Sequence, residues 1–276
     1  MKPGLALSIF NGGPITIVVA YPSGGDVDAM ARTYAEKLAG RLGRPVIVDN
    51  RPGASGTIGS AAVARAKPDG TTLLLAPSTF AIAQQVLKVG PNIAHDVVRD
   101  FTPIIKTGSI PLLLVTAQSS GIKDLRQLVT LARSGKPLTY GTPGAGSPMH
   151  IAGELFNSAA GIRIIHVPYR GLAPLLNEVL GGHVSVGWMT TGAAAEHVAS
   201  GRLVPLAVAE RKRTKLLPQV PTFAELRYHE VEVTAWMGLL GPKGMQADAA
   251  SALNRDFDDI LRLPDVQAKM SAMGIE

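Results

Sequence analysis

Short apolar runs alternate with amphipathic segments along most of the chain. Residues 15–20 form a β-branched run that is typical of a strand covered on both faces. The apolar residues of 31–42 then recur at helical spacing. The same alternation predicts strands and helices in turn at 45–49, 57–66, 71–76 and 79–87. Strands that alternate with helices predict an α/β fold with mostly parallel sheets flanked by helices.

A second series of the same kind begins near Pro111. Its expected strands are 112–116, 138–141, 162–167, 184–188 and 204–209, and its expected helices are 124–133, 148–159, 173–180 and 193–200. A last strand at 231–240 and a helix at 245–262 follow. We expect two lobes, one made of residues 1–108 and 232–276 and the other of 109–231. Crossings near 107–110 and 231–236 would form a hinge, with a ligand cleft between the lobes.

Composition removes several kinds of site. The 276 residues are 46% hydrophobic and 17% charged, which is enough apolar material for one large or two small cores. There is no cysteine, so disulfides, iron–sulfur clusters and thiolate zinc sites are excluded. The six histidines lack the spacing of a metal motif. We therefore expect neither a metal nor a cofactor.

The charge balance favours a small anionic ligand over nucleic acid. The 27 basic and 21 acidic residues give a net charge of +6, but the basic residues are scattered apart from one run at 211–215. With only 5% aromatic residues there is little to stack on bases, so we expect no nucleic-acid partner. No apolar run reaches the roughly 18 residues of a membrane helix. Residues 2–10 are apolar but lack the features of a complete signal peptide.

Two glycine-rich turns each join a strand to a helix, at 21–28 and 140–150. Such a turn directs backbone N–H groups and the positive helix end toward the carboxyl edge of the sheet, where open α/β sheets bind ligands. One turn in each lobe would make a clamp for a carboxylate. The alternative for the first turn is a plain connection in which Asp28 caps the helix.

Catalytic patterns are sparse. There is no Gly-x-Ser-x-Gly nucleophile elbow, and the second turn is neither a P-loop nor a dinucleotide fingerprint. An enzyme built on the same clamp would need a general base, for which Asp26 and His150 are the candidates. We expect a binding protein rather than an enzyme.

Seven stretches, in order along the chain, resemble the Bug/TctC-type solute-binding proteins of tripartite tricarboxylate transporters. They are IVVAYPSGG (17–25), DNRPGASGTIG (49–59), PDGTTLL (68–74), DFTPI (100–104), GSPMHIAGELF (146–156), HVPYRG (166–171) and VPTFAE (220–225).

The resemblance implies a two-lobed, type II-like periplasmic binding fold that closes on a small mono- or dicarboxylate. It also implies a periplasmic location and delivery of the ligand to membrane permease subunits, with a sensor kinase as the alternative partner. Lobe closure suggests a monomer. The ligand-binding residues that it implies are Tyr21, Ser23, Gly24, Gly25, Asp26, Asp28, Ser78, Thr79, Thr142, Gly146, Ser147, His150, Tyr169, Gly171 and Met189.

The chain departs from the family pattern at several positions. The family often has proline where Ser23 stands, and aspartates where Ser185 and Met189 stand. An acidic residue near the ligand would suit an amino group. Its absence at Met189 therefore predicts a ligand without a cation.

Overall fold

The structure is a computed structural model that describes residues 13–276, so the prediction about a signal peptide at 2–10 lies outside the described residues. The described chain divides into two compact units. The first contains the residues up to Gly108 together with Trp236–Met270, and the second contains Ser109–Ala235 and Ser271–Glu276.

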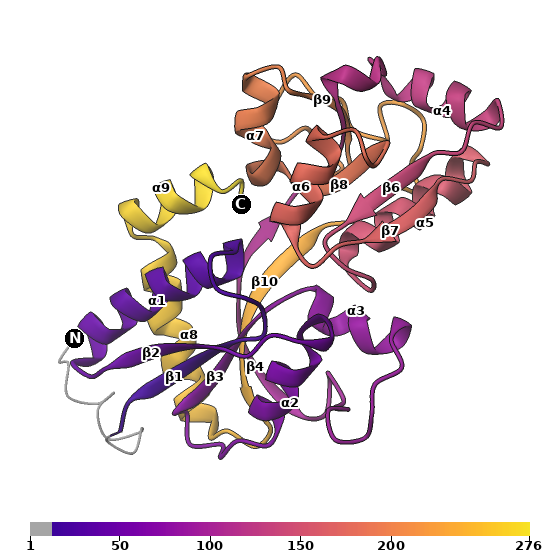
Figure 1. The fold of residues 1–276 in the computed structure, drawn as a ribbon. Coiled ribbons are helices and arrows are strands. Elements are labelled where there is room, and N and C mark those ends of the chain that lie inside the picture. The colour runs from indigo at the N-terminus through magenta and orange to yellow at the C-terminus, as the bar shows by residue number, and fades with distance from the viewer. Residues whose placement is uncertain (1–12) are drawn as a thin grey trace. The chain divides into compact units, whose positions relative to one another are not determined.

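The first unit is built on a five-stranded sheet in the order β2-β1-β3-β10-β4 (Figure 1). Strand β1 pairs in parallel with β2 and β3, and β10 pairs antiparallel with β3. The elements of the unit are β1 (Ile15–Val19), α1 (Asp26–Leu42), β2 (Val46–Asn50), α2 (Thr57–Ala64), β3 (Thr72–Pro77), α3 (Thr79–Val86), β4 (Phe101–Ile110), β10 (Ala235–Pro242), α8 (Ala247–Leu261) and α9 (Pro264–Ala272).

Burial of both faces explains the apolar strands of this sheet. In β1, Ile15, Ile17 and Val19 are fully buried, as a central strand between two helical layers requires. Helix α1 covers the sheet with a stripe that includes Tyr34, whose ring lies 5.6 Å from that of Phe257 in α8. The core thus fixes α1 against the sheet and so fixes the loop that precedes this helix.

The second unit has a sheet in the order β7-β6-β8-β5-β9. Strand β6 pairs in parallel with β7 and β8, whereas β5 runs antiparallel to both β8 and β9. Its elements are β5 (Leu112–Ala117), α4 (Leu125–Arg133), β6 (Thr139–Thr142), α5 (Pro148–Ala160), β7 (Ile165–Pro168), α6 (Leu172–Leu180), β8 (Val186–Thr190), α7 (Thr191–Ala199) and β9 (Leu203–Val208).

Local signals in the sequence fix the starts of two helices in this unit. The side chain of Asp124 accepts a hydrogen bond of 2.8 Å from the amide of Gln127 and so caps α4. Helix α5 begins with Ser147 as its cap and Pro148 in its first turn, where the missing proline N–H costs nothing.

The fold class predicted from the sequence is confirmed, with two α/β sheets flanked by helices. Each sheet is mixed, because β10 in the first and β5 in the second run against their parallel neighbours. Strand β4 and helix α9 were not predicted. The structure also places residues 271–276 in the second unit, so the chain passes between the units three times rather than twice.

Candidate functional site

Parallel strands bring three predicted segments of the first unit to one sheet edge. Strands β1, β2 and β3 end at Val19, Asn50 and Pro77, and their carboxyl ends meet at the same edge. The Tyr21 hydroxyl donates a 3.1 Å hydrogen bond to the carbonyl of Ser55, in the turn after β2. Burial raises the pKa of Tyr21 to about 12, although a hydrogen bond with Thr79 acts in the opposite direction. Tyr21 therefore stays a neutral phenol that ties the three connections together.

Helix α1 starts at this edge without a side-chain cap. Its N-cap is Gly25, which has no side chain to accept hydrogen bonds from the first turn. Gly24, just before it, has a φ of +88°, a conformation that favours glycine. Ser23, Gly24 and Gly25 are all exposed, and Asp26 is half-buried at the first helical position. The start of a seventeen-residue helix thus presents its positive end on an exposed loop.

Asp28 supports this loop from within. Its carboxylate accepts hydrogen bonds from the Gly24 amide (2.9 Å), from Asn50 (3.0 Å) and from Arg32 (3.1 Å), and its side chain is 5% exposed. Burial alone would raise the pKa of Asp28, but the hydrogen bonds from Arg32, Gly24 and Asn50 together lower it. The Asp28 carboxylate is not the helix cap but supports the loop before the helix, and its direct contact with a ligand stays a prediction.

Ser78 also forms hydrogen bonds within the protein. Its amide donates to the carbonyl of Trp236 at 2.8 Å, and its hydroxyl accepts from the Trp236 amide at 3.3 Å. These bonds join the β3–α3 turn to β10. Thr79 follows as the first residue of α3 and is 9% exposed. The side chain of Thr79 makes a hydrogen bond with that of Tyr21.

In the second unit, β6, β7 and β8 likewise end at one edge. The next two turns continue the pairing beyond the strands, because the amide of Tyr169 donates to Thr142 at 2.9 Å and that of Gly171 donates to Pro143 at 3.0 Å. Gly171 has a φ of +113°, which lets the chain turn from β7 into α6. The structure thus joins Thr142, Tyr169 and Gly171 at the carboxyl edge of this sheet.

Several amides of the β6–α5 loop already have acceptors. Ser147 donates to the carbonyl of Gly144 at 3.3 Å, Gly146 donates to Nδ1 of His150 at 3.3 Å, and Gly144 donates to Oγ1 of Thr142 at 3.4 Å. The expectation that this turn offers unpaired backbone amides to a ligand is therefore wrong for Gly146 and Ser147. These bonds are long, which makes them weak.

A stack of three rings, which was not predicted from the sequence, lies behind this loop. His166 in β7 stacks on His150 with centroids 4.0 Å apart and on Tyr140 with centroids 5.0 Å apart. Its Nε2 lies 2.7 Å from Oγ1 of Thr142. Tyr140 and His166 are direct partners across β6 and β7, so strand register, which the sequence does not show, brings the rings together.

Met189 lies away from solvent. It is 1% exposed in β8 and packs in the hydrophobic core with Val179, Leu175 and Leu113. Residues of a fully buried strand face packed layers on both sides, so this side chain presents nothing to a ligand. The inference that Met189 excludes a cationic ligand is not supported by this geometry.

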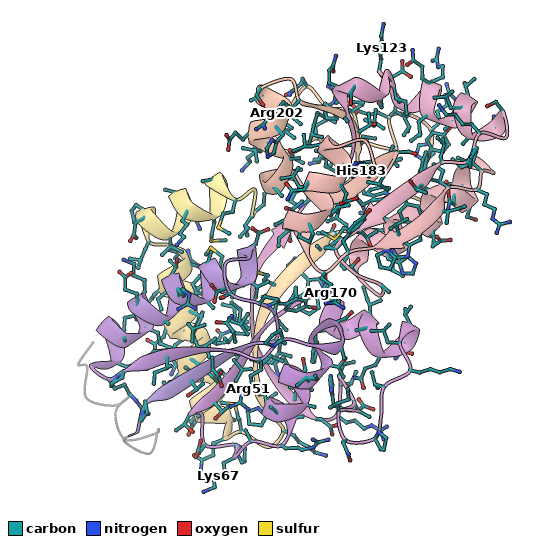
Figure 2. The ribbon with its side chains drawn as sticks, viewed as in Figure 1. Arg51, Lys67, Lys123, Arg170, His183 and Arg202 are labelled. Carbon is teal, nitrogen blue, oxygen red and sulfur yellow. The ribbon has the colours of Figure 1, made fainter. Side chains whose placement is uncertain are left out.

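An exposed arginine, Arg170, lies at one end of the second unit (Figure 2). Arg170, between Tyr169 and Gly171, is exposed and has no ion pair with any residue that the structure describes. Figure 2 shows it at the end of the unit opposite Lys123 and Arg202. It therefore adds an unneutralised positive charge to the edge that carries the β6–α5 loop.

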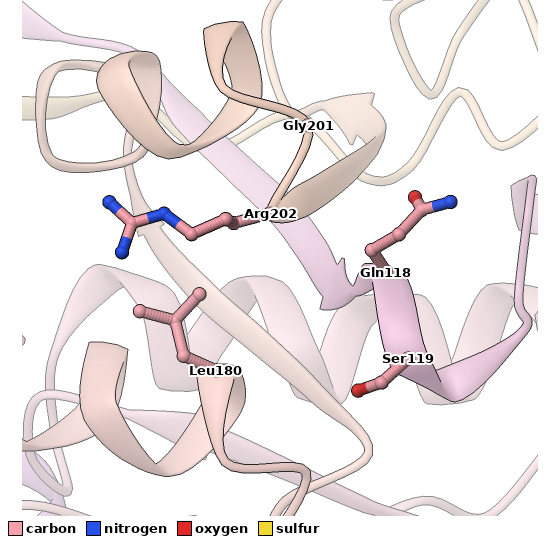
Figure 3. A pocket seen from close by; sticks show the side chains of 5 residues that line it. All are labelled: Gln118, Ser119, Leu180, Gly201 and Arg202. Carbon is pink, nitrogen blue, oxygen red and sulfur yellow. The ribbon is translucent and has the colours of Figure 1, made fainter.

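A hollow of about 520 Å³ lies at the other end of the second unit. Its lining is Gln118, Ser119, Leu180, Gly201 and Arg202 (Figure 3). These residues flank the start of β9 and the end of β5, at the edge opposite the carboxyl ends of β6 and β8. The hollow offers one guanidinium group on an open surface, so we place the candidate site at the carboxyl edges instead.

Residues 13–276 contain no cluster of three acidic or histidine side chains arranged to hold a metal ion. Among the same residues, no helix combines the length and the apolar character that crossing a membrane demands. The two sheet edges present backbone amides, hydroxyls and imidazoles, groups that bind an anion by hydrogen bonds.

The fold is that of periplasmic binding proteins. A family profile described as the tripartite tricarboxylate transporter family receptor, TctC, matches residues 30–276. The chain belongs to this family. Protein BugT of Bordetella pertussis is 36% identical over 263 residues, which cover 95% of this chain and 80% of BugT.

Solved structures share the fold closely. The periplasmic binding protein BugD is 30% identical with a TM-score of 0.86, over 97% of this chain and 89% of that one. Rpa4515 of R. palustris, solved with adipate, is 30% identical with a TM-score of 0.87, over 95% and 88%. MatC of Rhodopseudomonas palustris, with bound malate, is 27% identical with a TM-score of 0.83, over 96% and 90%.

Proposed function

We propose that this protein is a non-enzymatic, periplasmic solute-binding protein that captures a small mono- or dicarboxylate and delivers it to the membrane subunits of a tripartite tricarboxylate-type transporter. Its two units would act on the ligand together, by closure. The relatives solved with adipate and malate support a carboxylate ligand.

The observation that carries the proposal is the uncapped start of α1. Gly25 offers no side-chain acceptor, while Asp28, Asn50 and Arg32 hold the preceding loop in place. A carboxylate at this point would accept the hydrogen bonds that a capping residue normally accepts. Each bond to a charged acceptor contributes about 1.5–3 kcal/mol. Three or four such bonds, less the ordering cost, reach the roughly −8 kcal/mol of a micromolar complex.

The described side chains support binding rather than catalysis. Of the two candidates for a general base, His150 accepts the amide of Gly146 at its Nδ1, and Asp26 also has an interaction partner within the protein. A general base needs a free lone pair within reach of the substrate. We therefore expect that a bound acid is released without any chemical change to the acid.

The test introduces a capping side chain at the start of α1, where Gly25 has none. In the Gly25→Asp variant, the new carboxylate would accept the first-turn amides itself and repel an anionic ligand. Gly25 has an extended backbone, and no other atom lies within 4 Å of the place that a Cβ would take, so the side chain fits. We expect calorimetric titration with a panel that includes adipate and malate to give micromolar affinity for the native protein. Gly25→Asp should weaken it at least 100-fold without loss of thermal stability.

Gly25→Ala is the matched control, because it adds the Cβ but no acceptor. It should bind within about threefold of the native protein, since alanine neither caps the helix nor carries charge. A native protein that binds no acid on the panel, or a Gly25→Asp variant that binds as tightly as Gly25→Ala, would overturn the proposal. Mass spectrometry of the recovered ligand checks that no turnover occurs.

A further inference from the structure

His166 occupies the centre of the ring stack described above. Tyr140 lies on one face of its imidazole and His150 on the other, with interplanar angles of 28° and 15°. Its Nε2 meets the hydroxyl of Thr142, a side chain with no exposed surface. His166 thus contacts two residues of the candidate binding loop while lying behind them.

The surroundings of His166 keep its ring uncharged. Burial lowers the pKa of His166 to about 4, and the neighbouring His150 acts in the same direction. Glu154 in α5 opposes this shift, and its carboxylate accepts a hydrogen bond from the Tyr140 hydroxyl. Tyr140, His150 and Glu154 are the titratable groups facing His166 from β6 and α5. Two imidazolium rings stacked this closely would repel each other, so the stack favours neutral rings.

The hydrogen bond from Gly146 defines which nitrogen of His150 carries its proton. A backbone amide can only donate, so Nδ1 of His150 must be unprotonated where it accepts the Gly146 N–H at 3.3 Å. The proton of the neutral ring then resides on Nε2. His150 is half-buried, and its Nε2–H is a donor of the kind that a carboxylate accepts.

We propose that His166 is a positioning residue for carboxylate capture, which fixes Thr142 and holds His150 in the Nε2–H form that donates to the ligand. The inference rests on the proposed function for the identity of the ligand. Stacking sets the plane of the His150 ring, and this plane brings Nδ1 to the Gly146 amide. Without His166, the ring of His150 is free to rotate. His150 then populates both tautomers, and the β6–α5 loop adopts more than one conformation.

The first experiment uses the free protein and so does not depend on any ligand. Nitrogen-15 NMR of histidine-labelled protein reports which ring nitrogen is protonated, and a His150→Asn variant assigns the signal. We expect His150 to show only the Nε2–H tautomer in the native protein and in His166→Phe, which keeps a stacked ring. In His166→Ala it should show a mixture of tautomers.

His183→Ala is the control, since that histidine lies in the same unit with its side chain 71% exposed. It should leave the His150 signal unchanged. A pure Nε2–H tautomer in His166→Ala, or a mixed one in the native protein, would overturn the inference whether or not the protein binds carboxylates.

The second experiment measures coupling in binding. We expect the affinity for the tightest acid of the panel to fall about threefold in His166→Phe, which loses the bond to Thr142. It should fall about tenfold in both His166→Ala and His150→Ala. If His166 acts through His150, the double alanine variant should lose no more than about thirtyfold, because residues that act as one unit are not additive. A hundredfold loss, the product of the two single effects, would contradict the inference.

Discussion

Single side chains in this protein often serve the site by holding its backbone. Asp28, Tyr21 and His166 each bond to a loop rather than offering a free polar group to solvent. Preorganised loops of this kind bind a ligand without the entropic cost of ordering them first. Substitutions at such residues should therefore affect stability and affinity together.

Asp28→Asn tests this coupling through pH. The hydrogen bonds to Asp28 lower its pKa in the folded protein below the value of about 3.8 that it has in the unfolded chain. They therefore stabilise the folded state fully at pH values above about 3.8, and this stabilisation is lost as the pH falls through the lower pKa of the folded state. At pH 7 we expect the variant to lose about 1–3 kcal/mol of unfolding free energy. Urea unfolding from pH 7 down to pH 3 should show the difference from the native protein narrowing, because the native carboxyl becomes neutral too.

Asp69→Asn is the control for that prediction. Asp69 also has a lowered pKa, owing mainly to its hydrogen bond with Thr71, but it lies in the turn that enters β3 at the opposite edge of the sheet. It should lose stability without losing affinity for a carboxylate, whereas Asp28→Asn should lose both. Equal affinities in the two variants would show that Asp28 does not support the binding loop.

Met189 separates a core role from a binding role. An aspartate at this position would place a carboxylate among Val179, Leu175 and other core residues with no partner. We expect Met189→Asp to cost about 3–5 kcal/mol of unfolding free energy. Met189→Leu should cost less than about 1.5 kcal/mol, since it keeps the volume and the apolar surface. Chemical denaturation measures both, and a stable Met189→Asp variant that binds amino acids would restore the inference that this position selects against a cation.

At the scale of helices and strands, the hydrophobic pattern predicted the elements whose residues are mostly buried. The buried strands β1, β3 and β5 appear as apolar runs, and the caps at Asp124 and Ser147 can be recognised locally. Strand β4 was missed because its burial is mixed and Pro103 interrupts it. Helix α9 was missed because it is short, weakly amphipathic and begins at a proline.

The parts of the site that were missed depend on contacts between distant segments. Asn50 reaches Asp28 across 22 residues, and Tyr140 meets His166 across 26 residues because of strand register. Neither pairing leaves a local pattern in the sequence. The resemblance to the family predicted which loops bind the ligand, whereas only the structure showed which loop amides already have acceptors within the protein.

At the scale of the whole molecule, the last residues add a third connection between the units. The chain passes from one unit to the other after Gly108, after Ala235 and again after Met270. Within the second unit, Glu276 and Ser109 exchange two backbone hydrogen bonds, of 2.7 and 2.8 Å, and Ile275 is 3% exposed. The C-terminal segment 271–276 is therefore held next to the first crossing, and its attachment should contribute to stability.

Gly192 provides a way to test that attachment. A Cβ at this position in α7 would overlap the backbone carbonyl of Met273, which cannot move without displacing the C-terminal segment. We expect Gly192→Ala to cost about 1–3 kcal/mol. It should also speed hydrogen exchange of the Ser109 and Glu276 amides, whose mutual bonds depend on the segment.

Gly40→Ala is the opposite control, because Gly40 lies inside α1 with open space around it. There the same change should stabilise the protein by about 0.5–1 kcal/mol through better helix propensity. Unchanged exchange at Ser109 and Glu276 in Gly192→Ala would mean that the last residues do not secure this crossing.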